Sequence, residues 1–75
     1  MEFNLKEFTY VIAVADYRNI SLAAKVLYIS QPALSRFIIN LEERLGLMLF
    51  QRKGKTMELT DFGVKYVYYA REIVK

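Results

Sequence analysis

The sequence has 75 residues, 55% of them hydrophobic, and a formal net charge of +3. This length allows one small domain that buries only about 60% of its unfolded surface, so association with another chain would help to stabilise it. The absence of cysteine and histidine excludes disulfides, thiolate or imidazole metal sites, and Ser-His-Asp or Cys-His catalysis. No apolar run approaches the roughly 20 residues of a membrane span, and the first residues do not resemble an export signal. We therefore expect a cytoplasmic protein without a membrane partner.

A first helix is expected to begin after Asn4 and to run to about Asp16. Asparagine is a favourable N-cap, and an apolar stripe follows it at helical spacing. The stripe consists of Leu5, Phe8, Ile12 and Ala15, with Val11 beside it. This face is predicted to pack in the core.

Two further helices are expected around the short connection 28–30. Ser21 is predicted to cap a short helix whose inner face carries Ala23, Ala24 and Leu27. Ser30 is predicted to cap the next helix, with Pro32 in its first turn, where proline is tolerated. The core stripe of that helix is Leu34, Ile38, Leu41 and Leu45, and Gly46 ends it, with Leu47 available for a hydrophobic contact.

The pattern then becomes extended and ends in a fourth helix. Residues 49–52 and 56–59 are predicted to form two short strands around a turn that contains Gly54. Because an isolated hairpin is marginal, Leu49, Met57 and Leu59 should lean on the helices. Thr60 is predicted to cap a helix from Asp61 to the end of the chain.

This order of elements, and the three-residue spacing between the second and third helices, is typical of a winged helix-turn-helix. The third helix carries polar side chains opposite its core stripe, in the turns that would enter a major groove. The hairpin has three bases within four positions and no acid among them, which suggests contact with an anion such as DNA. Both features also occur on ordinary solvated surfaces, so neither decides the function alone.

The sequence also resembles the N-terminal domain of LysR-type transcriptional regulators from about Asn4 to its last residue. The resemblance is carried by Ser21-x-Ala23-Ala24-x-x-Leu27-x-Ile29-Ser30-Gln31-Pro32-Ala33-Leu34-Ser35-Arg36, Leu41-Glu42-x-x-Leu45-Gly46, Leu49-Phe50-x-Arg52 and Leu59-Thr60-x-x-Gly63. It implies a mainly α fold, with three helices, a two-stranded β-hairpin wing and the start of a linker helix. The domain would cover residues 3–60, with the helix-turn-helix at about 20–39 and the wing at about 49–60.

The resemblance implies sequence-specific binding of double-stranded DNA in bacterial transcription control, and no enzymatic activity. The third helix would lie in the major groove, where the family places residues matching Gln31, Pro32, Ser35 and Arg36. The wing residues Arg52 and Lys55 would approach the phosphates and the minor groove. The full set of candidate DNA-binding residues is Ser21, Ser30, Gln31, Pro32, Ser35, Arg36, Ile39, Asn40, Arg52, Lys53 and Lys55.

Two positions of the third helix depart from the family pattern, which more often has polar or basic residues there. Phe37 flanks the core stripe and is expected to add to the core. Ile39 lies well away from that stripe, so it either packs on a thymine methyl group or has no role in binding.

Residues 61–75 are expected to form a truncated linker helix that joins two copies. Its apolar residues occupy more of the circumference than packing on one core requires, which favours a homodimer that binds two half-sites. The candidate dimerisation residues are Phe62, Tyr66, Tyr69, Ala70 and Ile73. The resemblance further implies a larger C-terminal domain that binds a small-molecule effector. That domain is absent from this sequence, which looks like part of a longer regulator. The sequence itself is expected to contain no cofactor or metal site.

Two other classes of function were weighed. A winged helix that binds a partner protein would not require three bases in the wing. An enzyme is disfavoured because no carboxylate pair or phosphate-binding glycine loop is present. Salt dependence of binding to random DNA separates the first alternative from DNA binding.

Overall fold

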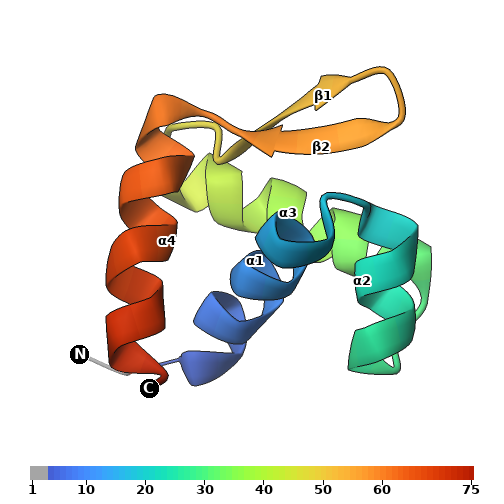
Figure 1. Cartoon of the computed structure of the whole chain (residues 1–75), viewed down its shortest axis with the longest axis horizontal. Coiled ribbons are helices and arrows are strands. Elements are labelled where there is room, and N and C mark those ends of the chain that lie inside the picture. Colours follow the sequence, from blue (N-terminus) through green and yellow to red (C-terminus); the bar gives the residue numbers. More distant parts are fainter. Residues whose placement is uncertain (1–3) are drawn as a thin grey trace.

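The computed structural model describes residues 4–75, so the predicted start of the domain at residue 3 lies outside the described part. The elements in order are α1 (Leu5–Tyr17), α2 (Ile20–Leu27), α3 (Gln31–Leu45), β1 (Phe50–Lys53), β2 (Thr56–Leu59) and α4 (Asp61–Ile73). In Figure 1, α1 lies centrally between α2 and α4, and the hairpin extends from one end of the helical body. The mainly α class with a two-stranded antiparallel wing agrees with the sequence prediction.

Helix α1 begins as predicted but buries a different face. The Asn4 side chain accepts a hydrogen bond from the Lys6 N–H at 3.1 Å and caps the helix. Val11 and Val14 are fully buried, whereas Leu5 is exposed, so the expected stripe was wrong at its first position. The reason is that α1 packs against both α2 and α4, which rotates and widens its buried face.

Helix α2 begins two residues earlier than predicted, at Ile20 instead of Leu22. Arg18 adopts a left-handed conformation with φ 53°, and the Asn19 side chain then accepts from the Leu22 N–H at 2.9 Å. Asparagine is at least as good an N-cap as serine, so Asn19 takes this role and Ser21 lies inside the first turn. The prediction of a Ser21 cap was therefore wrong.

Helix α3 is capped at both ends by the predicted residues. The Ser30 hydroxyl accepts from the Ala33 N–H at 3.2 Å, and Gly46, with φ 75°, donates its N–H to the Glu42 carbonyl. Leu34, Ile38 and Leu41 are buried as expected. Leu45 and Leu47 are exposed, contrary to expectation.

The hairpin pairs Phe50 with Leu59 and Lys53 with Thr56, so Gly54 and Lys55 form the turn. Gly54 has φ 61°, which glycine adopts without strain. Leu49 is fully buried just before β1, and β2 packs Met57 and Leu59 against the core, as predicted. The Met57 N–H also donates to the Arg18 carbonyl at 3.0 Å, which attaches the hairpin to the end of α1.

Helix α4 follows the wing and lies against α1. The Thr60 hydroxyl caps it by accepting from the Gly63 N–H at 3.0 Å, as predicted. The helix ends at Ile73, two residues before the expected end. Within residues 4–75, no helix combines the length and apolarity that crossing a bilayer requires.

Candidate nucleic-acid interface

The face of α3 opposite its core stripe is open to solvent. Pro32, Arg36 and Asn40 are exposed there, and Ser35 is half-buried. Arg36 forms no ion pair with any carboxylate of residues 4–75. Its guanidinium is therefore available to a guanine edge or a phosphate, both of which suit its forked donors.

Two of the predicted recognition residues bind each other. The Gln31 side-chain amide donates a hydrogen bond to the Ser35 hydroxyl at 2.6 Å, one turn further along α3. This bond orients both side chains on the first two turns of the helix. A serine hydroxyl that accepts one bond can still donate its own proton to a DNA acceptor.

The other two predicted serines differ in role. The Ser30 hydroxyl is occupied as the cap of α3, so any contribution to binding would come in addition to that bond. Ser21 is exposed in the first turn of α2. Its position at a helix N-terminus suits an anion such as a phosphate.

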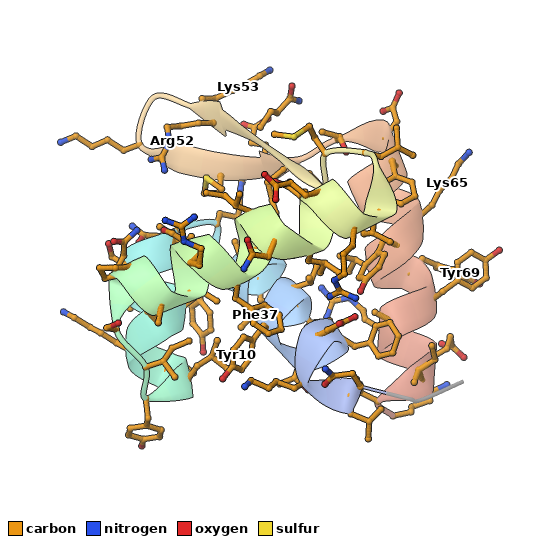
Figure 2. The ribbon with its side chains drawn as sticks, turned by 180° about the vertical axis from the view of Figure 1, so that it is seen from behind. Tyr10, Phe37, Arg52, Lys53, Lys65 and Tyr69 are labelled. Atoms are coloured by element: carbon orange, nitrogen blue, oxygen red, sulfur yellow. The ribbon has the colours of Figure 1, made fainter. Side chains whose placement is uncertain are left out.

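The wing is less charged than the sequence suggested. Arg52, Lys53 and Lys55 are exposed, but the strand pairing brings Glu58 beside them. The Glu58 carboxylate lies 3.8 Å from the Lys53 ammonium and 3.3 Å from the Arg18 guanidinium. The charge of Lys53 is thus partly neutralised, whereas Arg52 and Lys55 pair with no carboxylate in the described chain. Figure 2 shows Arg52 and Lys53 on the hairpin.

The fold brings α3 and the wing together around a surface hollow of about 210 Å³. Ser35 and Ile39 of α3 line it, and so does Arg52 of β1. Met48, in the loop that joins the two elements, completes its edge. The predicted recognition helix and the predicted wing therefore share one continuous surface.

A buried carboxylate that the sequence analysis missed fixes this arrangement. Glu42 is buried, and its carboxylate accepts hydrogen bonds from the backbone N–H groups of Leu49, at 2.7 Å, and Phe50, at 3.1 Å. These bonds attach the start of β1 to α3, so Glu42 holds the wing beside the recognition helix. The Leu-Glu-x-x-Leu-Gly motif contained the signal, because a carboxylate there lies one turn before the chain leaves α3.

Comparison with known proteins identifies the family. The model for "Bacterial regulatory helix-turn-helix protein, lysR family" matches residues 5–64. The chain belongs to the lysR family. It carries the winged helix-turn-helix domain of that family, so the fold class and the resemblance inferred from the sequence are confirmed.

Relatives and solved structures agree with this assignment. The chain is 43% identical over 74 residues to the HTH-type transcriptional regulator ClcR of Pseudomonas putida, covering 99% of the chain and 24% of ClcR. It is 38% identical to the CbnR DNA-binding domain in a crystallised DNA complex, with a TM-score of 0.88 and coverage of 96% and 83%. The BenM DNA-binding domain bound to catB site 1 DNA gives 36% identity, a TM-score of 0.90 and coverage of 96% and 80%. These relatives are regulators rather than enzymes, and the chain spans about a quarter of the length of curated relatives such as ClcR.

Phe37 and Ile39, the two positions of α3 where a departure from the family pattern was expected, have different surroundings. Phe37 packs against Tyr10 of α1, with ring centroids 4.8 Å apart, and the Lys6 ammonium lies 5.6 Å from the Phe37 ring. Figure 2 shows the two labelled side chains next to each other. Phe37 therefore adds to the helix packing as expected. Ile39 remains exposed, at 46% of its surface, beside the hollow.

The α4 residues proposed for dimerisation divide between two faces. Ala70 is fully buried in its own domain, so the prediction that it contacts a partner requires correction. Phe62 and Tyr66 are partly buried against the core, and their role in dimerisation stays a prediction. The reason is that α1 and β2 cover this side of α4. Tyr69 and Ile73 are exposed. The exposed face also includes Val64 and Tyr68, which the sequence analysis missed, and Figure 2 shows Tyr69 and Lys65 projecting outward from α4.

Two ion pairs join α1 to its neighbours α3 and α4. Arg44 of α3 binds Glu7 of α1 at 2.5 Å, and Arg71 of α4 binds Asp16 of α1 at 2.5 Å. The hydrogen bond to Asp16 raises the pKa of Arg71. Burial, reinforced by the negative charge of Glu7, raises the pKa of Tyr66 above its ordinary value of 10.0. Within residues 4–75, no group of three or more acidic side chains is placed to hold a metal ion.

Proposed function

We propose that this lysR-family domain recognises operator DNA for a bacterial, cytoplasmic transcriptional regulator. Helix α3 lies in the major groove, and the wing contacts the backbone and the minor groove beside it. The observation that carries this proposal is the shared surface on which Ser35 and Ile39 of α3 meet Arg52 of β1. Arg36 and Lys55 extend it with positive charges that no carboxylate of the described chain neutralises.

Fluorescence anisotropy on duplex DNA tests this function. Binding to a random duplex should weaken steeply with salt, because each phosphate contact releases counterions. A duplex selected by the chain from a random pool should bind about 10³-fold or more tightly than random DNA. Salt-insensitive binding, or no preference for the selected duplex, would favour a protein-interaction module instead.

The domain acts as a homodimer on two half-sites. Supporting this, the outer face of α4 exposes two adjacent tyrosines, Tyr68 and Tyr69, whose ring centroids lie 5.1 Å apart, together with Val64 and Ile73. A two-fold dimer through this face would present two α3 helices to major grooves about 34 Å apart, or a multiple of that distance.

Sedimentation equilibrium from micromolar to millimolar concentration tests dimerisation. Tyr69→Ser should weaken association, since this ring is 64% exposed in the monomer, whereas Leu22→Ser on α2 should leave it unchanged. A strict monomer without cooperative binding to a two-half-site duplex would exclude a dimer of this chain.

A small-molecule effector binds the remainder of the regulator, as the family resemblance implies, and titration of the longer protein would show it.

A further inference from the structure

The hollow between α3 and the wing has an apolar edge that polar DNA recognition does not explain. The apolar edge consists of Ile39 of α3, which is 46% exposed, and Met48 of the α3–β1 loop, which is 60% exposed. Ser35 and Arg52 line the same hollow and supply its hydroxyl and its positive charge. Both an apolar and an anionic part of one ligand would thus find complementary groups there.

The charge distribution places the two parts of that ligand. Glu42 lines the hollow together with Ile39 and Met48, and its carboxylate is held by the Leu49 and Phe50 N–H groups. A neighbouring hollow of about 350 Å³ shares Ile39, Glu42 and Met48 and adds Glu43. Two carboxylates beside the apolar edge disfavour a phosphate at that end and favour an uncharged group. The phosphate is better placed toward Ser35 and Arg52.

The proposed docking determines which part of DNA reaches this position. With α3 in the major groove and the wing at the adjacent minor groove, one sugar–phosphate strand separates the two elements. That strand must cross the surface between α3 and β1, where the hollow lies. We propose, resting on the DNA-binding function above, that the hollow seats one deoxyribose per half-site, with its C–H face on Ile39 and Met48 and its adjoining phosphate at Ser35 and Arg52.

Hydroxyl-radical footprinting tests this seat because the radical attacks deoxyribose hydrogens and reports their burial directly. The probe is a duplex that this chain selects from a random pool. Wild type should protect one sugar between the α3 and wing contacts. The double variant Ile39→Ser, Met48→Ser should lose that protection, keep the others, and bind about three- to tenfold more weakly.

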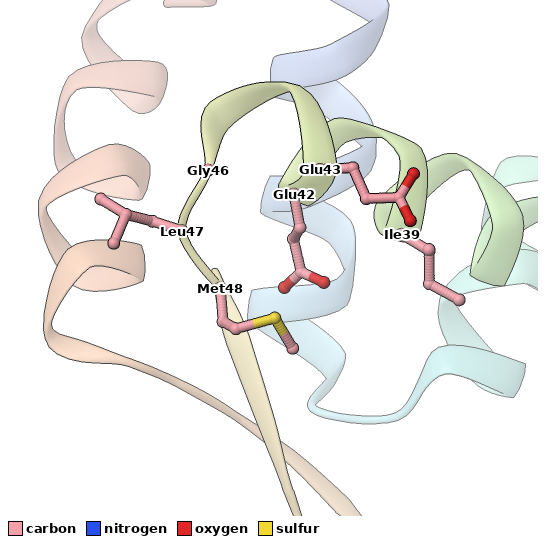
Figure 3. Close-up of a pocket in the computed structure, with 6 residues that line it drawn as sticks. All are labelled: Ile39, Glu42, Glu43, Gly46, Leu47 and Met48. Atoms are coloured by element: carbon pink, nitrogen blue, oxygen red, sulfur yellow. The ribbon is translucent and has the colours of Figure 1, made fainter.

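Leu47→Ser provides the matched control. Leu47 lies in the same loop and is exposed. It lines the neighbouring hollow but not the one proposed to seat the sugar, and Figure 3 shows its side chain leaving the loop in the direction opposite to Met48. Its footprint should equal that of wild type. Thermal denaturation of the double variant should match wild type, since both substituted side chains are at the surface.

Three outcomes overturn the proposal. An unchanged footprint of the double variant on DNA that it still binds would show that the hollow seats no sugar. If replacing one thymine by uracil weakened wild type but not Ile39→Ala, Ile39 would read a base methyl group instead. If wild type bound and protected no duplex, the proposed function itself would fail.

Discussion

The Gln31 amide donates to the Ser35 hydroxyl at 2.6 Å, so two side chains proposed to face DNA are coupled before DNA is present. Ordering them in advance lowers the entropy that binding must overcome. We predict that Gln31→Ala and Ser35→Ala each weaken binding to a selected duplex and that their effects are not additive. A double-mutant cycle measured by anisotropy should give a coupling of about 0.5–1.5 kcal/mol.

The pairing of Arg36→Ala with Gln31→Ala gives the control cycle, since no hydrogen bond joins these two side chains in the described structure. Its coupling should be smaller. Additive effects of Gln31→Ala and Ser35→Ala would show that the bond seen in the free protein does not contribute to binding.

Arg36 is predicted to discriminate between sequences. Its guanidinium is exposed on α3 and has no carboxylate partner among residues 4–75, so it can bind a guanine in a bidentate manner. Arg36→Ala should cost about 1–3 kcal/mol on the selected duplex and less on random DNA. An equal loss on both duplexes would assign Arg36 to a phosphate.

Lys55 is predicted to bind a phosphate without reading sequence. Lys55→Ala should weaken binding on all duplexes and flatten the log–log salt dependence by about 0.9 for each subunit. Lys53→Ala is the comparison, because Glu58 lies 3.8 Å from the Lys53 ammonium and partly neutralises it. Its slope should change less than that of Lys55→Ala, and an unchanged slope for Lys55→Ala would remove Lys55 from the backbone contacts.

The sequence predicted the order of the elements because their signals are local. Asn4, Ser30 and Thr60 cap their helices as expected, and Gly46 and Gly54 take the positive φ angles that end α3 and turn the hairpin. Such features depend on neighbouring residues alone. The lysR motif then supplied the way in which the local elements assemble.

The errors concern contacts between distant segments. A helical stripe indicates an apolar face but not how many neighbours cover the helix, so Leu5 was placed inside and Ala70 was assigned to a partner. The strand pairing that brings Glu58 to Lys53 was likewise hidden. Glu42 was the largest omission, because its role depends on where the backbone of Leu49 and Phe50 passes after the chain turns back.

Tyr66 predicts a loss of stability at alkaline pH. Its pKa is raised in the folded protein by burial and by Glu7, so the unfolded chain loses this proton first as the pH rises through about 10. The folded state then binds more protons than the unfolded state, and the free energy of unfolding falls. Tyr66→Phe should show a smaller fall than wild type between pH 8.5 and 11 in urea denaturation.

Tyr28→Phe is the control for the alkaline measurement, because the Tyr28 side chain is 94% exposed. Its stability should follow the wild-type pH dependence. Identical profiles for Tyr66→Phe and wild type would mean that the Tyr66 hydroxyl does not contribute to the alkaline loss.

Gly63 is predicted to be essential where α4 crosses the start of the wing. A Cβ added there would overlap the carbonyl oxygen of Leu49, which also accepts from the Thr60 N–H at 3.0 Å. Backbone on both sides cannot move without breaking this bond, so Gly63→Ala should destabilise the domain by about 1–3 kcal/mol or more in urea unfolding. Gly54→Ala offers the contrast, because open space surrounds its Cβ and only the cost of φ 61°, about 1 kcal/mol, applies. If Gly63→Ala proved no more destabilising than Gly54→Ala, the close approach of α4 to Leu49 would not be required for the fold.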